Sequence, residues 1–188
     1  MERMEDNDAV AVERARGGSS EAFRELVERH SRAVFRLAYR MTGNEQDAED
    51  TVQETFLRAY RQLGRFDSRS KFSTWLFAIA SNCSLDLIRA RKRRRETDSE
   101  PVQPAIPAAD PSPERLMLSR EVRQRLSAAM DELSDAERTA FVMRHFEGVP
   151  IDEIARVLGR PNGAARHSVF RAVAKLRRAL EPVLSEAR

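Results

Sequence analysis

The strongest chemical signal in the sequence is a set of polar and basic side chains that continues one face of an apolar helix. Between Phe72 and Arg95, residues recur at spacings of four, three, four and three, which places them on one side of a helix. They are Trp75, Ile79, Asn82, Asp86 and Arg89. The side begins apolar and becomes polar at Asn82, and only arginine and lysine fill positions 91–95. Such a helix can pack at one end and bind a polyanion along the other.

A second basic segment lies between Gly159 and Leu180, where basic residues stand at 160, 166, 171, 175, 177 and 178 and there is no acid. A short helix over 151–158, a turn over 159–163 and a longer helix to Leu180 together predict a helix-turn-helix. Its outward residues would be Arg166, His167, Phe170 and Arg171. Arginine reads guanine and an apolar ring can touch a thymine methyl, so DNA binding is expected. The alternative for Phe170 is packing on a neighbouring helix.

An acidic face is predicted on the helix that Asn44 would cap and Gly64 would end. Glu49, Asp50, Gln53 and Glu54 share this face, opposite an expected apolar inner face. That inner face consists of Val52, Phe56, Ala59, Tyr60 and Leu63. A solvated surface is one interpretation, but no lysines alternate with these carboxylates as in a salt-bridged surface helix. A partner surface is the other.

The sequence contains no pattern for bond-making chemistry. Its 3 histidines would lie on three different helices without metal-ligand spacing, and there is no glycine-rich phosphate loop or nucleophile motif. We therefore expect no catalytic residue, no metal and no cofactor. The 1 cysteine, Cys83, excludes an internal disulfide. No apolar leader or membrane span is apparent, so a cytoplasmic protein without membrane insertion is expected.

Composition and spacing favour an all-α fold. The chain of 188 residues is 41% hydrophobic and 34% charged, with 7 glycines and no alternating apolar run. Five prolines between Glu96 and Pro113 argue against a continuous helix there and predict a flexible linker. Two small helical domains are thus expected, over 1–95 and 114–188, with the linker at 96–113. Helix starts are predicted at Ser19 or Ser20, Ser73 or Thr74, the Ser134–Glu137 capping box, and Asn162.

The order of these motifs resembles the bacterial RNA polymerase sigma factors. DAEDTVQETFLRAY (47–60) and FSTWLFAIASNCSLDLIR (72–89) are similar to the domain that binds polymerase and the minus-ten promoter element. LSDAERTAFVMRHFEGVPIDEIARVLGRPNGAARHSVFRAVAKLR (133–177) is similar to the domain that reads the minus-thirty-five element. Because only a proline-rich linker separates them, the resemblance is to the compact extracytoplasmic-function (ECF) group. It implies core RNA polymerase and promoter DNA as partners, an anti-sigma factor as a further one, and work at the bacterial nucleoid.

The resemblance also implies roles for individual residues. Asp50, Gln53 and Glu54 match positions that contact the polymerase clamp helices. Phe66 and Asn82 match positions that hold a base flipped out of the minus-ten element, and the basic run, with Arg89 and Arg93, would contact phosphates there. The positions expected at the minus-thirty-five element are Arg166, His167, Phe170, Arg171 and Lys175.

Three departures from the family pattern put the DNA preference in doubt. Ala164-Ala165 stand where Thr-Val is common, His167-Ser168 where Ser-Arg is common, and Val173 where arginine is common. Two missing arginines would weaken phosphate contacts. A stand-alone repressor that uses the helix-turn-helix is the alternative function, but it leaves the acidic face and the cationic central helix unexplained. For Asp86, and for Asn82, a buried polar network within the bundle is the alternative to a functional role. For Phe66 the alternative is a local anchor.

Overall fold

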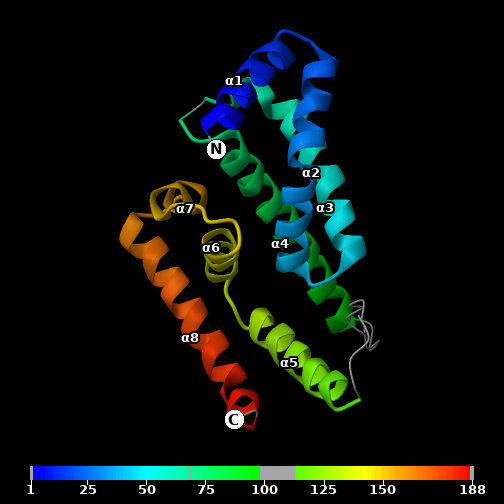
Figure 1. Ribbon diagram of the computed structural model, residues 1–188, viewed down its shortest axis with the longest axis vertical. Helices are drawn as coiled ribbons and strands as arrows, with labels where there is room; N and C mark the ends of the chain where they lie inside the picture. The colour runs from blue at the N-terminus through cyan, green and yellow to red at the C-terminus, as the bar shows by residue number, and fades with distance from the viewer. Residues whose placement is uncertain (1, 68, 98–112, 187–188) are drawn as a thin grey trace. The chain divides into compact units, whose positions relative to one another are not determined.

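The described part of the chain consists of helices and the turns between them. The computed structural model describes residues 2–67, 69–97 and 113–186, and no strand occurs within these ranges. The all-α expectation is thereby confirmed (Figure 1). The chain divides into two compact units, residues 1–103 and 104–188.

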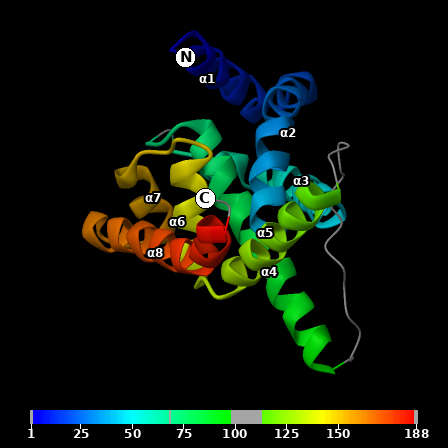
Figure 2. The same ribbon diagram turned by 60° about the horizontal axis from the view of Figure 1, so that its bottom comes forward.

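The first unit contains four α-helices and one short 3₁₀ helix. These are α1 (Glu2–Arg16), α2 (Ser20–Thr42), α3 (Glu45–Gln62), η1 (Leu63–Arg65) and α4 (Phe72–Thr97). Helices α2, α3 and α4 pack on one another in pairs, and α1 packs mainly on α2 (Figure 1). The C-terminal end of α4 projects beyond its neighbours (Figure 2). The basic end of this helix is therefore presented away from the core of its unit.

Local hydrogen bonds explain where these helices begin and end. The Ser19 hydroxyl accepts from the Ala22 amide, and the Asn44 side chain accepts from the Asp47 amide, as expected for N-caps. Gly43 adopts a left-handed φ of 67° and ends α2. Helix α3 ends at Gln62, two residues before the predicted stop at Gly64, which lies within η1. The cap predicted at Ser73 or Thr74 is also misplaced, since α4 already begins at Phe72.

The core of the first unit is apolar where α2 meets α4, but partly small and polar along α3. Leu26, Leu37 and Leu76 are fully buried. The predicted inner face of α3 is confirmed at Phe56, Ala59 and Leu63, which are buried, but not at Val52 and Tyr60. Tyr60 is exposed and only its ring edge meets Phe23, with centroids 4.9 Å apart, while Val52 is half-buried. The buried residues of α3 are Ala48, Thr51, Thr55, Phe56 and Ala59.

The second unit holds the expected helix-turn-helix. Its helices are α5 (Pro113–Asp131), α6 (Asp135–His145), α7 (Ile151–Leu158) and α8 (Asn162–Glu186). The capping box at Ser134 and Glu137 is present as predicted, whereas Asn162 is the first residue of α8 rather than its cap. Gly159, with a φ of 60°, ends α7 and opens the tight turn.

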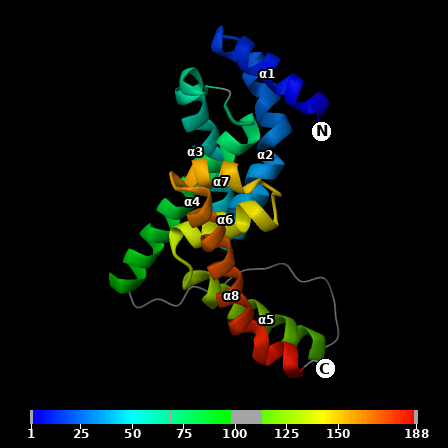
Figure 3. The ribbon, with the colours of Figure 1, turned by 90° about the vertical axis from the view of Figure 1, so that its left-hand side faces the viewer.

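Helix α8 is the element on which this unit is built. Helices α5, α6 and α7 each pack on it, and Figure 3 shows α5 lying along its C-terminal half. One core cluster joins α5 to α8 through Ala129, Leu133, Ala172 and Leu176. Around the turn, Ile154, Ala165 and Ser168 are buried. The N-terminal half of α8 keeps one face outside this core.

The predicted linker lies mostly outside the described residues. Residues 98–112 are not described, and the two ends of the 96–113 segment belong to helices, because α4 continues to Thr97 and α5 begins at Pro113. Within the described ranges, no helix combines the length and the hydropathy that a bilayer span requires.

Candidate nucleic-acid interface

The expected partner face on α3 lines a groove between α3 and α4. Asp50 and Gln53 are exposed, and Glu54 is half-buried. The groove has a volume of about 380 Å³. Its lining is formed by Asp50, Thr51, Gln53, Glu54, Leu57, Arg58, Cys83, Asp86 and Leu87. The three residues named from the sequence therefore share one concave surface.

Arg58 also belongs to this groove, although it was not among the residues predicted from the sequence. Its Nε donates to Glu54 Oε1 at 2.6 Å, and its Nη1 lies 3.4 Å from Asp86 Oδ2. The hydrogen bond with Glu54 raises the pKa of the Arg58 guanidinium. The i,i+4 spacing of Glu54 and Arg58 could have indicated the first pair. One cation thus stands among three carboxylates, and the face is mixed in charge rather than purely acidic.

Asp86 is not part of a buried network. Half of its side chain is exposed, and its other oxygen, Oδ1, lies 3.3 Å from Arg89 Nη1. Asp86 therefore links the α3 groove to the first arginine of the basic run.

The basic end of α4 is divided between an internal ion pair and exposed cations. Arg91 Nη2 lies 2.8 Å from Asp47 Oδ2 in the first turn of α3. Burial raises the pKa of the Asp47 carboxyl, although Arg91 opposes the shift. Lys92, Arg93 and Arg94 are exposed on the projecting part of the helix. These three cations, rather than Arg91, form the surface that a polyanion can reach.

The two residues expected to hold a base differ in exposure. Asn82 is exposed, in agreement with its place where the apolar side turns polar. Phe66 is buried, with 5% of its surface exposed, and its ring packs on Phe72 and Trp75 at centroid distances of 5.6 and 5.2 Å. This is the local-anchor arrangement. The Phe66 ring is therefore not open to a base in this arrangement.

Helix α1 is held against α2 by a charged cluster. Asp8 accepts hydrogen bonds from Arg29 Nη1 and lies 2.9 Å from His30 Nε2. Burial alone would raise the pKa of the Asp8 carboxyl, but the bonds from His30 and Arg29 lower it overall. The His30 ring also meets Phe72 edge-on, with centroids 5.5 Å apart. This cluster could not be predicted from the sequence, because nothing in the periodicity pairs residues 22 positions apart.

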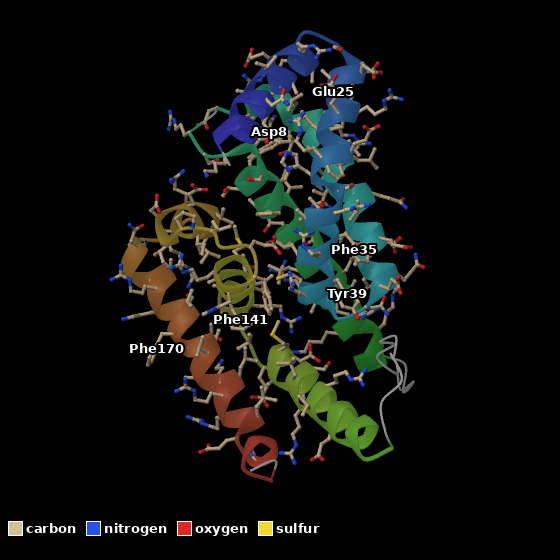
Figure 4. All side chains as sticks on the ribbon, viewed as in Figure 1. Asp8, Glu25, Phe35, Tyr39, Phe141 and Phe170 are labelled. Carbon is tan, nitrogen blue, oxygen red and sulfur yellow. The ribbon has the colours of Figure 1, made fainter. Side chains whose placement is uncertain are left out.

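The outward face of α8 contains the residues expected from the sequence. Arg166, His167 and Arg171 are exposed, and Phe170 is 71% exposed. Figure 4 shows Phe170 projecting from α8. The alternative that Phe170 packs on another helix is therefore wrong. An aromatic ring between arginines on a helix-turn-helix suits contact with base edges in a major groove.

The Glu137 carboxylate contacts two of the α8 residues expected at the minus-thirty-five element, Arg171 and Lys175. Arg171 Nε lies 3.0 Å from Glu137 Oε1, and Lys175 Nζ lies 2.8 Å from Oε2 of the same residue. Lys175 also donates to the Glu132 carbonyl oxygen at 3.2 Å. Two of the three Lys175 donors are thus used within the protein.

Some of the residues that depart from the family pattern are buried, and others are exposed. Ala165 and Ser168 are buried, and the Ser168 hydroxyl donates to the Ala164 carbonyl oxygen at 3.0 Å. Val173 is half-buried, whereas His167 is exposed. Of the substituted residues, His167 is thus the one most open to a base.

The described residues hold no cluster of three or more histidine, cysteine, aspartate or glutamate side chains that could bind a metal ion. Cys83 is buried at the base of the α3–α4 groove, and burial raises the pKa of its thiol. A buried thiol with a raised pKa is a poor nucleophile.

Comparison with known proteins places both surfaces in one family. Residues 26–94 match the family model of sigma-70 region 2, and residues 123–176 match that of sigma-70 region 4. The chain is 36% identical to the RNA polymerase sigma-H factor of Pseudomonas aeruginosa, over 97% of this chain and 98% of the relative. It is 32% identical to the ECF RNA polymerase sigma factor SigW of Bacillus subtilis, over 90% and 94%.

A solved structure supports the same assignment. CnrH, in complex with the cytosolic domain of CnrY, matches with a TM-score of 0.67 and 30% identity, over 94% of this chain and 98% of CnrH. Because near-complete relatives at this identity show the family, the chain belongs to the extracytoplasmic-function group of the sigma-70 family, whose members bind core RNA polymerase and direct promoter-specific initiation of transcription.

Proposed function

We propose that the two compact units divide initiation between them. The first, corresponding to residues 1–95, binds core polymerase and opens the minus-ten element. The second, corresponding to residues 114–188, anchors the minus-thirty-five element, and residues 96–113 link them. The observation that carries this proposal is the exposed reading face of α8, with Phe170 at 71% exposure beside Arg166 and Arg171.

Asp50, Gln53 and Glu54 form the polymerase contact in this proposal. They line the α3–α4 groove together with Leu57, which is half exposed. A groove with carboxylates at its rim and an accessible leucine suits a helix that presents basic and apolar side chains. Arg58 and Asp86 then set the charge of the groove floor.

At the minus-ten element, Asn82 holds an extruded base while Arg89 and Arg93 contact phosphates. Unstacking a base costs about a few kcal/mol, so a site that holds it converts binding energy into strand opening. Phe66 joins this site when its ring leaves the cover of Phe72 and Trp75 on α4, on which it packs in the present conformation. The exposed cations at 92–94 neutralise phosphates and release counterions.

At the minus-thirty-five element, Arg166, His167, Phe170 and Arg171 face the major groove. Arg171 offers its terminal amines to a guanine, and Phe170 meets a thymine methyl. Lys175 has one remaining donor for a phosphate. His167, where the family commonly has serine, adds a larger side chain with a ring nitrogen at a base edge.

Sigma factors are initiation factors rather than enzymes, and we propose that this chain catalyses no reaction of its own. It acts in the bacterial cytoplasm at the nucleoid, where polymerase and promoters are found. CnrH was solved with a bound protein segment, the cytosolic domain of CnrY. By analogy, we propose that an anti-sigma factor binds the present chain and blocks its polymerase-binding surface.

Run-off transcription tests the proposal. Core polymerase with the full chain is incubated with a pool of genomic promoter fragments, and start sites are mapped. Specific start sites that share elements near minus ten and minus thirty-five support it. Failure to associate with core polymerase, with retained DNA binding, would instead support the stand-alone repressor.

A further inference from the structure

Glu137 lies where the reading helix meets the rest of its unit. It is 4% exposed, and its own amide and carboxylate form the capping box with Ser134 at the start of α6. Its Oε2 accepts from the Ser134 amide at 3.0 Å and from Lys175 Nζ at 2.8 Å. Its Oε1 lies 3.0 Å from Arg171 Nε. One carboxylate thus connects the α6 N-terminus to two residues that are one turn apart on α8.

The charge state of this carboxylate suits the arrangement. Burial would raise the pKa of Glu137, but the hydrogen bonds from Lys175 and Ser134 outweigh it and lower the pKa overall. Glu137 therefore remains an anion near neutral pH. A carboxylate anion attracts the Arg171 guanidinium, 3.0 Å away, more strongly than a neutral acceptor would.

The atom that Glu137 engages determines what Arg171 can still do. A guanidinium has five N–H donors in a fixed planar fork, and the 3.0 Å ion pair with Glu137 Oε1 approaches it on the Nε side. The four terminal N–H groups remain, and 57% of the Arg171 side chain is exposed. With its Nε side drawn toward Glu137, the guanidinium can still form the bidentate pair that guanine O6 and N7 accept through its two terminal nitrogens. A side chain that is already ordered loses less conformational entropy when it binds DNA.

We propose that Glu137 is a positioning residue for promoter reading, because it fixes the Arg171 guanidinium in an orientation that presents its terminal amines to one base pair. This rests on the proposed contact between Arg171 and the minus-thirty-five element. Glu137 itself contacts no DNA. Its negative charge weakens general attraction to phosphates, and in return it raises the discrimination between base pairs.

Glu137→Gln is the informative substitution. Glutamine at this position keeps the capping box, because either side chain can accept from the Ser134 amide. It removes the charge that holds Arg171 and Lys175. Glu121→Gln is the matched control, since it makes the same chemical change within the same unit, where Glu121 pairs only locally with Arg125 at 2.9 Å. Thermal melting of the full chains checks that both variants fold.

The measurement is binding of holoenzyme to duplexes that carry each single base-pair change across a mapped minus-thirty-five element. A bidentate guanine contact discriminates by roughly 5- to 150-fold. We expect Glu137→Gln to reduce discrimination at the Arg171 base pair by roughly 3- to 30-fold, with affinity for substituted duplexes unchanged or higher. Glu121→Gln should discriminate between the substituted duplexes as the wild type does. A purely structural defect would lower affinity for every duplex by the same factor.

The double variant separates failure of this inference from failure of the proposed function. In an Arg171→Ala background, Glu137→Gln should have no further effect on discrimination. If Arg171→Ala alone changes nothing, the proposed reading role of Arg171 is wrong. If Arg171→Ala abolishes discrimination but Glu137→Gln leaves it intact, or sharpens it, then Glu137 does not position Arg171 and the inference is overturned.

Discussion

Arg91 on α4 forms an ion pair with Asp47 in the first turn of α3, with 2.8 Å between Nη2 and Oδ2. Both side chains are largely covered, at 28% and 14% exposure. One arginine of an apparently uniform basic run is therefore used to hold two helices together. Its neighbours Lys92, Arg93 and Arg94 are exposed.

This division predicts opposite effects for two arginine substitutions. Arg91→Ala leaves the partly buried Asp47 without its cation and should lower the free energy of unfolding by about 1–2 kcal/mol. Arg93→Ala should leave stability nearly unchanged but reduce the slope of log affinity against log salt by about 1 unit. Urea melts measure the free energy of unfolding. Holoenzyme–promoter binding at several salt concentrations measures the slope of log affinity against log salt. Equal loss of stability in both variants would contradict the division.

The α3–α4 groove gives a prediction about polymerase binding. Gln53→Ala with Glu54→Lys should abolish co-purification with core polymerase, because the groove loses two of its rim contacts and one carboxylate becomes a cation. Loss of the exposed Glu54–Arg58 pair should cost only about 0.3–0.5 kcal/mol of stability. Gln46→Ala with Glu45→Lys makes the same two changes in the first turn of α3. It should retain polymerase, and its failure to do so would show that any charge change on α3 is disruptive.

Cys83 reports on the same groove. Because it is buried and the pKa of its thiol is raised, iodoacetamide should modify it much more slowly in the folded chain than in urea. Core polymerase should slow the reaction further, since Asp50, Gln53 and Glu54 line the groove that leads to the thiol. The extent is read by mass spectrometry of the peptide that contains Cys83. The Gln53→Ala, Glu54→Lys variant should show no slowing by polymerase.

Features that depend on neighbouring residues could be predicted from the sequence. The caps at Ser19 and Asn44 and the Ser134–Glu137 box were expected correctly, because each is a hydrogen bond within one turn. The helix-turn-helix followed from the spacing around Gly159. Exposure of Phe170 followed from its place on the outward face of α8.

Features that depend on packing between distant segments could not be predicted from the sequence. Thr51 and Thr55 are fully buried on α3, yet threonine gives no hydrophobic signal, so the predicted inner face omits them and includes the exposed Tyr60. The Asp8–His30 pair joins residues from different helices, and no periodicity indicates it. The burial of Phe66 follows from the same packing, because its cover comes from Phe72 and Trp75.

The Glu137 carboxyl should make stability depend on pH in the acid range. Its pKa in the folded chain lies below the ordinary value of 4.5, so the unfolded chain binds more protons below that value. The stabilisation is fully present above about pH 4.5 and is lost as the pH falls through the lower folded pKa. Urea melts of the full chain between about pH 6 and about pH 3 should show a shallower acid loss for Glu137→Gln than for the wild type. Identical profiles would mean that the carboxyl titrates normally.

The last prediction separates strand opening from promoter anchoring. Arg171→Ala should weaken closed-complex binding, whereas Asn82→Ala, on the exposed polar part of α4, should leave duplex binding nearly intact and suppress permanganate reactivity of thymines at the start site. A template already mismatched over the minus-ten element should largely restore transcription by Asn82→Ala, because the unstacking cost of about a few kcal/mol is already met. The same mismatched template should restore transcription by Arg171→Ala much less. Equal rescue of both variants, or of neither, would show that melting and anchoring lie on other residues.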